Sequence, residues 1–390
     1  MREGWEYKKL GEMASSELGK TLNKSKDTGK LYPYICAVNV LWDMIDLTIL
    51  KHAFFEKEEI DRYSVRKGDL LVCEGGDTGR SAIWEKEEPV LYQNALHRVR
   101  FTTEMEARFA MYCLWHLKNN GQIDQKYSKG VTIKHLVKSS LLSIELPVPP
   151  LSTQLSIVSE LDKINELIRL KKEQLKDYDN LAQSIFHEMF GDPVVNEKGW
   201  EVKKLGEVAM IKTGPFGSML HKEDYITGGI PLINPMHIQN FKAVPDKDFT
   251  ISKEKAAELC NYQLKINDVI FARRGDIGRC AVISDKEAGC LCGTGSLFVR
   301  FERKLSSIYT MYVVRTTSFI KELVSKAKGA TMLNLNSSTM ENLRFPIPPL
   351  PLQQLFAQRI ELIEKQKADV QRTIADLETL LASRMQYWFD

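Results

Sequence analysis

Long apolar runs are missing from the sequence. Nowhere among its 390 residues do about 18 apolar residues follow one another, which is the length that a membrane-spanning helix needs. The first residues, 1–6, also lack the apolar core of a secretory signal. We therefore expect a soluble cytoplasmic protein that has no membrane partner.

A disulfide framework is missing too. The chain has 7 cysteines, an odd number scattered along its length, and only Leu291 separates Cys290 from Cys292. An even set of cysteines in a short chain would be typical of a disulfide-rich secreted domain. We therefore expect free thiols in a reducing compartment.

Signatures of phosphate, nucleotide and metal sites are absent as well. No Gly-x-x-x-x-Gly-Lys-Ser/Thr loop occurs, and the 7 histidines show no metal-ligand spacing. His187-Glu188 lacks the second histidine of a zinc helix, and Gly293-Thr294-Gly295 is more typical of a turn than of a nucleotide loop. The sequence therefore predicts that this chain itself holds no metal and no cofactor.

Two Pro-Pro pairs, at 149–150 and 348–349, do not indicate a methyltransferase site. They follow Val148 and Ile347, whereas an amino-methyltransferase needs Asn or Asp before Pro-Pro-aromatic to accept the amine hydrogens. Proline at the start of a helix explains both pairs. We therefore predict no catalytic residue in this chain.

The net charge is small but unevenly distributed. The 54 basic and 51 acidic residues leave a charge of only +3. By segment, the charge is +1 for residues 1–145, −3 for 146–195, +6 for 196–344 and −1 for 345–390. Positive and negative charge therefore belong to different parts of the chain.

The chain contains an internal repeat. Residues 5–12, Trp-Glu-Tyr-Lys-Lys-Leu-Gly-Glu, recur as Trp-Glu-Val-Lys-Lys-Leu-Gly-Glu at 200–207, and Gly-Asp-Thr-Gly-Arg at 76–80 recurs as Gly-Asp-Ile-Gly-Arg at 275–279. Two further elements occur twice in the same order: a Pro-Pro-Leu element, and a Gly-x-Thr segment that a leucine follows. Copies of about 195 residues are too long for solenoid units. We expect two similar domains, each with a connector, related by a pseudo-two-fold axis.

The first part of each copy reads as mixed helix and strand, so we predict an α+β fold. Apolar runs at 69–73 and 268–272 stop at the Gly-Asp-x-Gly segments and resume at 82–84 and 281–283, which indicates strand, turn and strand. Apolar residues recur at steps of three and four over 107–118 and 308–323. This spacing predicts one helix in each copy.

Each copy ends in a heptad pattern that predicts a helix of about 35 residues, or about 50 Å. A stripe sustained over several heptads favours pairing of the two helices in a coiled coil, although an amphipathic helix lying on its own domain is the alternative. The predicted seam residues are Ile157, Leu161, Ile164, Ile168, Leu175, Tyr178, Ile185, Phe356, Ile360, Ile363, Val370, Ile374, Leu377 and Leu381.

Only a short linker follows Gly191-Asp192-Pro193, which ends the first helix. If the second helix returns beside the first, the pair must be antiparallel. We therefore predict two mixed domains, 1–145 and 196–344, separated by long helical segments at 146–195 and 345–390.

Recognition is the activity that the residues suggest. Arginine forks suit bidentate contacts to guanine or phosphate, lysines neutralise phosphates, and loop amides can read base edges. Each candidate could also be a solvated loop residue, and Arg80 and Arg279 could pair with Asp77 and Asp276. The candidates for contact with double-stranded DNA are Asn23, Lys24, Lys26, Arg80, Lys126, Lys129, Lys134, Ser218, Asn234, His237, Arg273, Arg274, Arg279, Lys326, Lys328, Asn334 and Asn336.

The order of these elements resembles the specificity subunits of type I restriction-modification systems. The resemblance covers essentially the whole chain. It consists of Trp-Glu-x-Lys-Lys-Leu-Gly-Glu, the Gly-Asp-x-Gly-Arg turn, Gly-x-Thr-x-x-x-Leu and Pro-Pro-Leu-x-x-Gln before a long helix, with Gln154 and Gln353 at the glutamine position. Each motif is weak alone, and their duplication in one order makes the resemblance strong.

The resemblance implies a non-catalytic DNA reader. Each of two target-recognition domains would read one half of a bipartite asymmetric site, while the helices set the spacing and dock two methyltransferase subunits. It implies S-adenosylmethionine on those partners and restriction, or translocase, subunits in the complex. Two other functions stay open from the residues: a self-contained nuclease or methyltransferase with twin active sites, and a coiled-coil scaffold joining two protein-binding modules.

Overall fold

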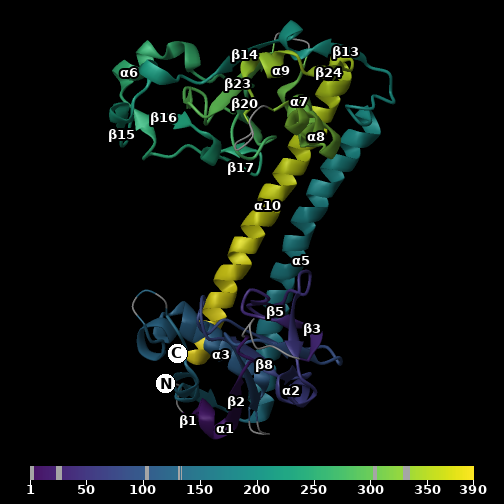
Figure 1. Cartoon of the computed structure of the whole chain (residues 1–390). Coiled ribbons are helices and arrows are strands. Elements are labelled where there is room, and N and C mark those ends of the chain that lie inside the picture. The colour runs from purple at the N-terminus through teal and green to yellow at the C-terminus, as the bar shows by residue number, and fades with distance from the viewer. Residues whose placement is uncertain are drawn as a thin grey trace. The chain divides into compact units, whose positions relative to one another are not determined.

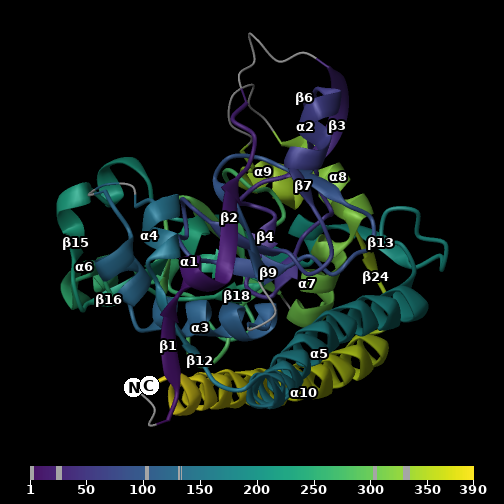
Figure 2. The ribbon, with the colours of Figure 1, turned by 90° about the horizontal axis from the view of Figure 1, so that it is seen from below.

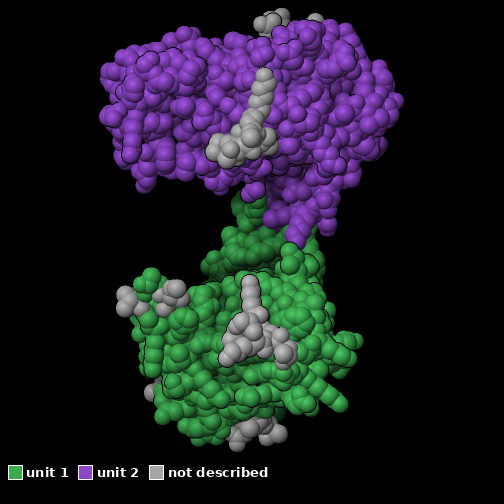
Figure 3. Space-filling view, viewed as in Figure 1, with its two compact units in different colours: residues 1–173, 371–390 green, residues 174–370 purple. Residues whose placement is uncertain are grey.

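The computed structural model describes residues 4–22, 29–101, 105–130, 132, 134–301, 305–327 and 334–390. The chain forms two compact units (Figure 3). Unit 1 comprises residues 1–173 and 371–390, and unit 2 comprises residues 174–370. Each unit therefore contains one module of sheets and short helices together with parts of both long helices.

Unit 1 contains two main sheets. The first has the order β2-β11-β8-β9 and the second the order β6-β3-β10-β7. All pairs are antiparallel except β3 with β10, which is parallel. The strands are β2 (Ala14–Leu18), β3 (Lys30–Ile35), β6 (Lys51–Phe55), β7 (Ser64–Val65), β8 (Leu70–Cys73), β9 (Ser81–Ile83), β10 (Val90–Tyr92) and β11 (Leu96–Phe101).

Unit 2 repeats this arrangement. Its first sheet has the order β14-β23-β20-β21 and its second the order β15-β19-β16-β22, again with one parallel pair, β16 with β22. The predicted internal repeat and α+β class are therefore confirmed. The strands are β14 (Ala209–Thr213), β15 (Tyr225–Ile226), β16 (Ile230–Ile233), β19 (Thr250–Ile251), β20 (Val269–Ala272), β21 (Cys280–Val282), β22 (Leu291–Cys292) and β23 (Ser296–Phe301).

Short elements close each module. β1 (Glu6–Lys9) pairs with β12 (Glu145–Val148), and β13 (Glu201–Lys204) pairs with β24 (Arg344–Ile347). Small hairpins are formed by β4 (Val40–Leu41) with β5 (Met44–Ile45) and by β17 (Ile238–Gln239) with β18 (Lys242–Ala243). The short α-helices are α1 (Leu10–Met13), α2 (Lys57–Arg62), α4 (Lys138–Leu142), α6 (Lys253–Glu258) and α9 (Ser337–Glu341). The π-helix is η1 (Ile123–Tyr127), and the 3-10 helices are η2 (Leu205–Glu207), η3 (Gly217–Met219), η4 (Lys222–Asp224), η5 (Pro235–His237) and η6 (Cys260–Tyr262).

The Gly-Asp-x-Gly segments form the predicted turns. They connect β8 to β9 and β20 to β21. Gly79 and Gly278 have φ of 86° and 102°, in the region that favours glycine. A side chain at Gly79 would also come within 2.9 Å of Ile123. The glycines of the repeated motif are therefore needed for chain reversal and, at Gly79, for close packing.

The module helices differ between the units. α3 (Ala107–Asn119) is one helix, as predicted, but the prediction of a single helix over 308–323 was wrong. The chain there forms α7 (Ser307–Arg315) and α8 (Thr317–Lys326). Thr316 has extended backbone angles, and its side chain accepts a hydrogen bond from the backbone N–H of Phe319, so it ends one helix and caps the next.

The two long helices, α5 (Leu151–Phe190) and α10 (Leu350–Phe389), have 40 residues each. At 1.5 Å per residue each spans about 60 Å, longer than predicted, because each helix begins directly after its Pro-Pro pair. The ribbon views show them side by side (Figures 1 and 2).

Ion pairs between the long helices confirm the antiparallel direction inside each unit. In unit 1, Glu160 of α5 pairs with Arg384 of α10, and Lys172 with Glu378 at 2.8 Å. In unit 2, Lys367 pairs with Asp179 at 2.9 Å, and Arg359 donates to the Met189 sulfur at 3.9 Å. The partner's number in α10 falls as the number in α5 rises, as antiparallel pairing requires.

Most predicted seam residues are buried. Leu175, Tyr178, Ile185 and Leu377 are half-buried. Near its C-terminal end α5 packs against the module of unit 2, and Ala182, Phe186 and Phe190 are buried there. Thus the alternative of a helix lying on a domain holds at the helix ends. The fully covered seam residues are Ile157, Leu161, Ile164, Ile168, Phe356, Ile360, Ile363, Val370, Ile374 and Leu381.

The motif glutamines join each long helix to its module. Gln353 is fully buried; its Oε1 accepts from the backbone N–H of Ser306 at 2.7 Å, and its Nε2 donates to the Pro348 carbonyl at 2.8 Å. Gln154 makes the equivalent bonds to Glu106 and Pro149 at 2.8 and 2.9 Å. The side chain thus ties the helix start to the residue that caps the module helix.

We expect Gln353→Leu to lower the free energy of unfolding of unit 2 by about 2 kcal/mol, because it leaves a buried N–H and a buried carbonyl without partners. Hydrogen exchange of the α7 and α10 amides would measure the loss. The neighbouring Gln354 is exposed, so Gln354→Leu is the matched control. Equal protection in the two variants would contradict the role given to Gln353.

Candidate nucleic-acid interface

Loops from five segments converge in each unit at the ends of the strands. We call each group a loop cluster. The unit 1 cluster comprises 19–22, 36–39, 74–80, 93–95 and 134–136. The unit 2 cluster comprises 214–221, 234–237, 273–279, 293–295 and 334–336.

Main-chain hydrogen bonds assemble the unit 1 cluster. The N–H of Gly19 donates to the carbonyl of Leu96 at 3.1 Å, and that of Gln93 to Ile35 at 3.0 Å. The N–H of Glu74 donates to Ala95 at 2.9 Å, and the carbonyl of Glu74 accepts from Leu136 at 2.7 Å. Position 74 is therefore held by both of its neighbouring loops.

The same four bonds recur in unit 2. The N–H groups of Gly214 and Gly293 donate to Ser296 and Ile233, each at 3.0 Å. The N–H of Arg273 donates to Gly295 at 3.1 Å, and the carbonyl of Arg273 accepts from Leu335 at 2.9 Å. The two loop clusters thus share one backbone frame while carrying different side chains.

Close backbone approach explains two glycines of the frame. A Cβ on Gly214 would overlap the carbonyl of Gly293, and a Cβ on Gly19 would overlap the carbonyl of Gln93. Glycine is required where two backbones approach this closely. The turn predicted at Gly293-Thr294-Gly295 is therefore a structural part of the cluster.

The structure brings some unit 1 candidates to the cluster. Arg80 donates to the Ala37 carbonyl at 2.9 Å and lies 3.7 Å from Asp77, as its alternative interpretation expected. Lys134 donates to the Asp124 carbonyl at 2.9 Å. Lys126 lies over the Tyr127 ring at 5.0 Å and belongs to η1, while Lys129 bridges to His135 next to the cluster.

Several unit 2 candidates share one site. Arg273 donates through Nε to Oδ1 of Asn334 at 3.3 Å, and Arg274 forms a β-bridge with Asn334. Arg279 lies 3.4 Å from Asp276, so this arginine has a local partner too. Arg273 and Arg274, by contrast, form no ion pair with any residue that the structure describes.

Other unit 2 candidates have structural roles. His237 is buried and its Nδ1 lies 2.9 Å from the Leu232 carbonyl, while Asn234 precedes η5 and caps it together with His237. Asn336 caps α9 by accepting from Thr339 at 2.8 Å. Ser218 lies in η3 inside the cluster.

The remaining candidates lie apart from the cluster or cannot be placed. Lys326 pairs with Glu322 within α8. Asn23, Lys24, Lys26 and Lys328 lie outside the described residues.

Exposed apolar residues in the clusters were not found from the sequence. Phe216 is 58% exposed and Met236 is 54% exposed in unit 2, and Val38 is 69% exposed at the position in unit 1 that aligns with Met236. Apolar side chains of this kind can contact the thymine methyl group. From the sequence, an apolar residue is usually assigned to the core. The only sequence feature that could have indicated exposure of these residues is their position in loops between strands.

A three-layer stack joins the hairpin beside each loop cluster to the module helix, α3 or α7. In unit 1, Trp42 stacks on Trp115 with ring centroids 5.1 Å apart, and Trp115 stacks on Tyr112 at 6.1 Å. In unit 2, the Arg315 guanidinium lies 4.0 Å from the Phe241 ring and 4.6 Å from that of Tyr312. A cation between two rings thus replaces the central tryptophan.

The hairpins that carry Trp42 and Phe241 follow directly after segments 36–39 and 234–237 of the clusters. In unit 1, Asp43 pairs with Arg108 at 2.7 Å and accepts from Asn165 of α5 at 2.6 Å. Burial raises the pKa of Asp43 to about 6, although Arg108 acts in the opposite direction. The hairpin therefore connects a loop of the cluster to the start of the long helix.

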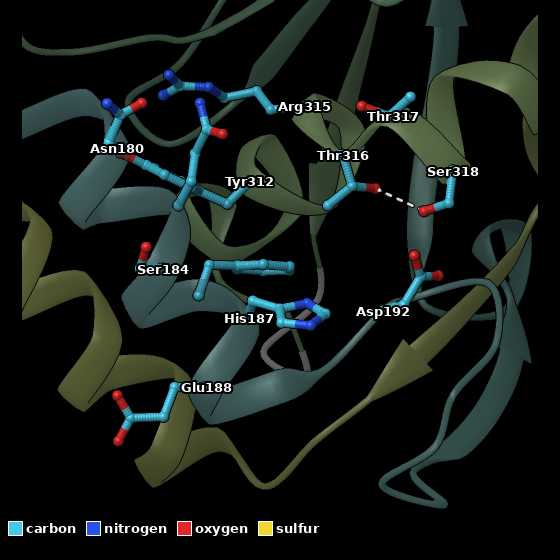
Figure 4. Close-up of a pocket in the computed structure, with 12 residues that line it drawn as sticks. Asn180, Ser184, His187, Glu188, Asp192, Tyr312, Arg315, Thr316, Thr317 and Ser318 are labelled. Atoms are coloured by element: carbon cyan, nitrogen blue, oxygen red, sulfur yellow. Dashed lines mark hydrogen bonds between the residues drawn. The ribbon is translucent and has the colours of Figure 1, made fainter. Parts of the chain in front are cut away.

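A cavity of about 730 Å³ lies in unit 2 beside the end of α5 (Figure 4). Its lining includes His187, Thr316 and Ser318. The Ser318 hydroxyl oxygen lies 3.3 Å from that of Thr316. Although partial burial acts in the opposite direction, a hydrogen bond from Ser318 and two backbone N–H groups hold the pKa of Asp192 below its usual value. These polar groups serve the junction of α7 and α8, and the loop clusters do not contribute to the cavity.

The described residues contain no group of three or more metal-ligating side chains, and none of the described helices is long and apolar enough to cross a membrane. All seven cysteines are free. Burial raises the pKa of the Cys73 thiol to about 11 and that of Cys280 to about 12, which disfavours the reactive thiolates.

Comparison with protein families shows which family the chain resembles. The family described as the type I restriction modification DNA specificity domain matches residues 2–177 and 197–379. The two matched segments contain the two modules and most of both long helices.

Curated relatives match over most of the chain. The type I restriction enzyme MjaIX specificity subunit of Methanocaldococcus jannaschii is 25% identical over 391 residues, which cover 93% of this chain and 87% of that protein. The EcoBI specificity subunit of Escherichia coli is 22% identical, over 77% of this chain and 67% of its own length.

Solved structures share the fold. The S subunit of a type I restriction-modification system from M. genitalium has a TM-score of 0.55 at 15% identity, covering 100% of this chain and 98% of its own. A chain from work on complex assembly and conformational transition of the type I system has a TM-score of 0.61 at 18% identity, covering 99% and 97%. At these identities the likeness concerns the fold alone.

His97, inside the unit 1 core, generates a pH prediction. Burial lowers its pKa, against the opposing effects of the Leu136 carbonyl and the Glu74 carboxylate, while Lys138 adds to the lowering. The unfolded chain therefore takes up the proton first as the pH falls below about 6.5. The stability contributed by neutral His97 is present above that pH and is lost as the pH falls.

We expect the free energy of unfolding of unit 1 to fall more steeply between pH 7 and 5 in the wild type than in His97→Gln. The extra slope has an upper limit of about 1.4 kcal/mol per pH unit. Denaturant unfolding followed by hydrogen exchange in β11 would measure it. If the free energy of unfolding depended on pH equally in the two proteins, the pKa of His97 would be the same in the folded and unfolded states, which contradicts the prediction.

Proposed function

Because this chain belongs to the type I restriction-modification DNA specificity family, we propose that it reads a bipartite asymmetric DNA site, one half with each module. The observation that carries the proposal is the pair of loop clusters, which share a backbone frame but differ in their side chains. One frame with unlike side chains suits two half-sites of different sequence. Side chains that contact base edges in the major groove determine which sequence is bound, whereas contacts to the DNA backbone position the protein.

The charges support this assignment. The segment 196–344 carries a charge of +6, and the helical segments 146–195 and 345–390 carry −3 and −1. A basic module attracts the DNA backbone, whereas the acidic helices suit protein partners. Those partners would be two methyltransferase subunits, which would bring S-adenosylmethionine, and restriction, or translocase, subunits acting in the cytoplasm.

The chain itself would be non-catalytic. Asp43, whose pKa burial raises to about 6, is held in a structural pair with Arg108, and burial raises the pKa of the Cys280 thiol and disfavours its reactive thiolate. Methyl transfer would therefore require the partner subunit. Cleavage or methylation of DNA by the purified single chain would favour a self-contained enzyme with twin active sites. Failure to bind DNA even when the methyltransferase is present would favour a coiled-coil scaffold that joins two protein-binding modules.

The long helices would set the gap between the half-sites. Each spans about 60 Å, equivalent to about 18 base pairs at 3.4 Å per pair. Inserting one heptad into each helix, after Lys172 in α5 and opposite it after Glu378 in α10, keeps the seam in phase and adds about 10 Å.

We expect the gap in the methylated site to grow by about three base pairs in that variant, with both half-sites unchanged. Long-read methylation sequencing of cells that express the chain with its methyltransferase reports the half-sites and the gap together. A matched insertion of seven residues after Asp285, in the exposed stretch 284–286, is the control. An unchanged gap in the helix variant would contradict spacing by the helices.

The arginines of the unit 2 cluster generate a second prediction. Replacing Arg273, Arg274 and Arg279 by alanine removes three cations from one loop, so we expect at least tenfold weaker binding of the second half-site. Binding of duplexes that vary one half-site at a time would measure it. If binding of only the first half-site became weaker, the assignment of these arginines to the second half-site would be contradicted.

A further inference from the structure

Positions 74 and 273 occupy the same place in the two loop clusters. Each follows the last residue of a buried strand, β8 or β20. Each donates its N–H to the residue that precedes the neighbouring strand of the sheet, β11 or β23, and accepts at its carbonyl from the N–H two residues before a short helix, α4 or α9. The two side chains therefore start from equivalent backbone positions, yet one is a carboxylate and the other a guanidinium.

The unit 2 position carries positive charge without a local counter-charge. Among the described residues, no carboxylate lies within ion-pair distance of Arg273 or Arg274. Burial and the neighbouring Arg274 both lower the pKa of Arg273. The Arg273 guanidinium is oriented by Asn334, which accepts from Nε and leaves the two terminal nitrogens for another acceptor.

The unit 1 position carries the opposite charge, and it too has no ion-pair partner among the described residues. The next residue is Gly75, where unit 2 has Arg274, and the ring of His135 lies against it. The nearby cations have other partners: Arg80 bonds Ala37 and Asp77, and Lys134 bonds Asp124. Glu74 is therefore a half-buried carboxylate without a cation beside it.

The chemistry of DNA restricts what these two groups can contact. Phosphate repels a carboxylate, whereas the base amino groups of the major groove, N4 of cytosine and N6 of adenine, can donate to one. A guanidinium with two free nitrogens matches O6 and N7 of guanine. The two positions thus have opposite hydrogen-bonding polarity on one frame.

We infer that Glu74 and Arg273 are equivalent base-reading positions, Glu74 selecting a base that presents an amino group and Arg273 selecting guanine. The inference rests on the proposed function and goes beyond it by assigning one base class to one residue in each half-site. It also explains why the two modules differ in charge at a position where their backbones agree.

The experiment uses the complete chain expressed with its methyltransferase. Glu74→Gln and Arg273→Gln keep polar side chains at half-buried positions, and Glu87→Gln and Lys286→Gln change exposed residues outside the clusters as matched controls. Methylated sites are sequenced, and binding of the purified complex is measured on duplexes that carry each base at each half-site position.

We expect Glu74→Gln to reduce discrimination at one base pair of one half-site by about tenfold, and Arg273→Gln to do so at one base pair of the other. The unchanged half-site in each variant shows that the protein is folded. The controls should retain the wild-type site.

Two results would overturn the inference. One is an unchanged preference at every position in both variants. The other is weaker binding to all sequences alike with a smaller salt dependence, which would mean that Arg273 contacts phosphate. A wild-type complex without any bipartite site would instead refute the proposed function, so the two failures can be told apart.

Discussion

Burial of the ends of the long helices is the constraint on which the structure depends. Phe186 and Phe190, near the end of α5, pack with Tyr309 of the second module, and Phe389, at the end of α10, packs against Phe109 of the first. Removing an aromatic side chain of this size from water contributes about 2 kcal/mol or more. Each module therefore completes its core with a helix that belongs to the other repeat.

The same constraint fixes where recognition can occur. The glutamines, the hydrogen bond from Tyr112 to Asp162 of α5 and the packing of Tyr312 on Phe356 of α10 hold each module against the long helices. The loop clusters lie at strand ends, where short connections leave side chains accessible. A hairpin connects the two regions, so a change in the helices would reach the loops through a few packed groups. Accurate spacing and accurate reading are thus properties of one continuous set of contacts.

Much of this architecture was predictable because it depends on periodicity. The repeat, the α+β class, the turns and the seam follow from patterns of apolar residues and glycine, which the backbone imposes locally. The break at Thr316 was not predictable, since its apolar spacing continues through the capping residue. Nor was the burial of Phe186 and Phe190, which depends on a module distant in sequence. Arg80, with its local partners, shows why residue type alone does not identify a contact.

The loop clusters are held together by main-chain atoms, and this has an evolutionary consequence. A frame built from N–H and carbonyl groups does not depend on which side chains project from it, apart from glycines at points of close approach. Mutation can therefore exchange a carboxylate for a guanidinium without disturbing the scaffold, as the two halves of this chain already illustrate. Such a molecule can acquire a new target through single substitutions, while its assembly with other proteins stays the same.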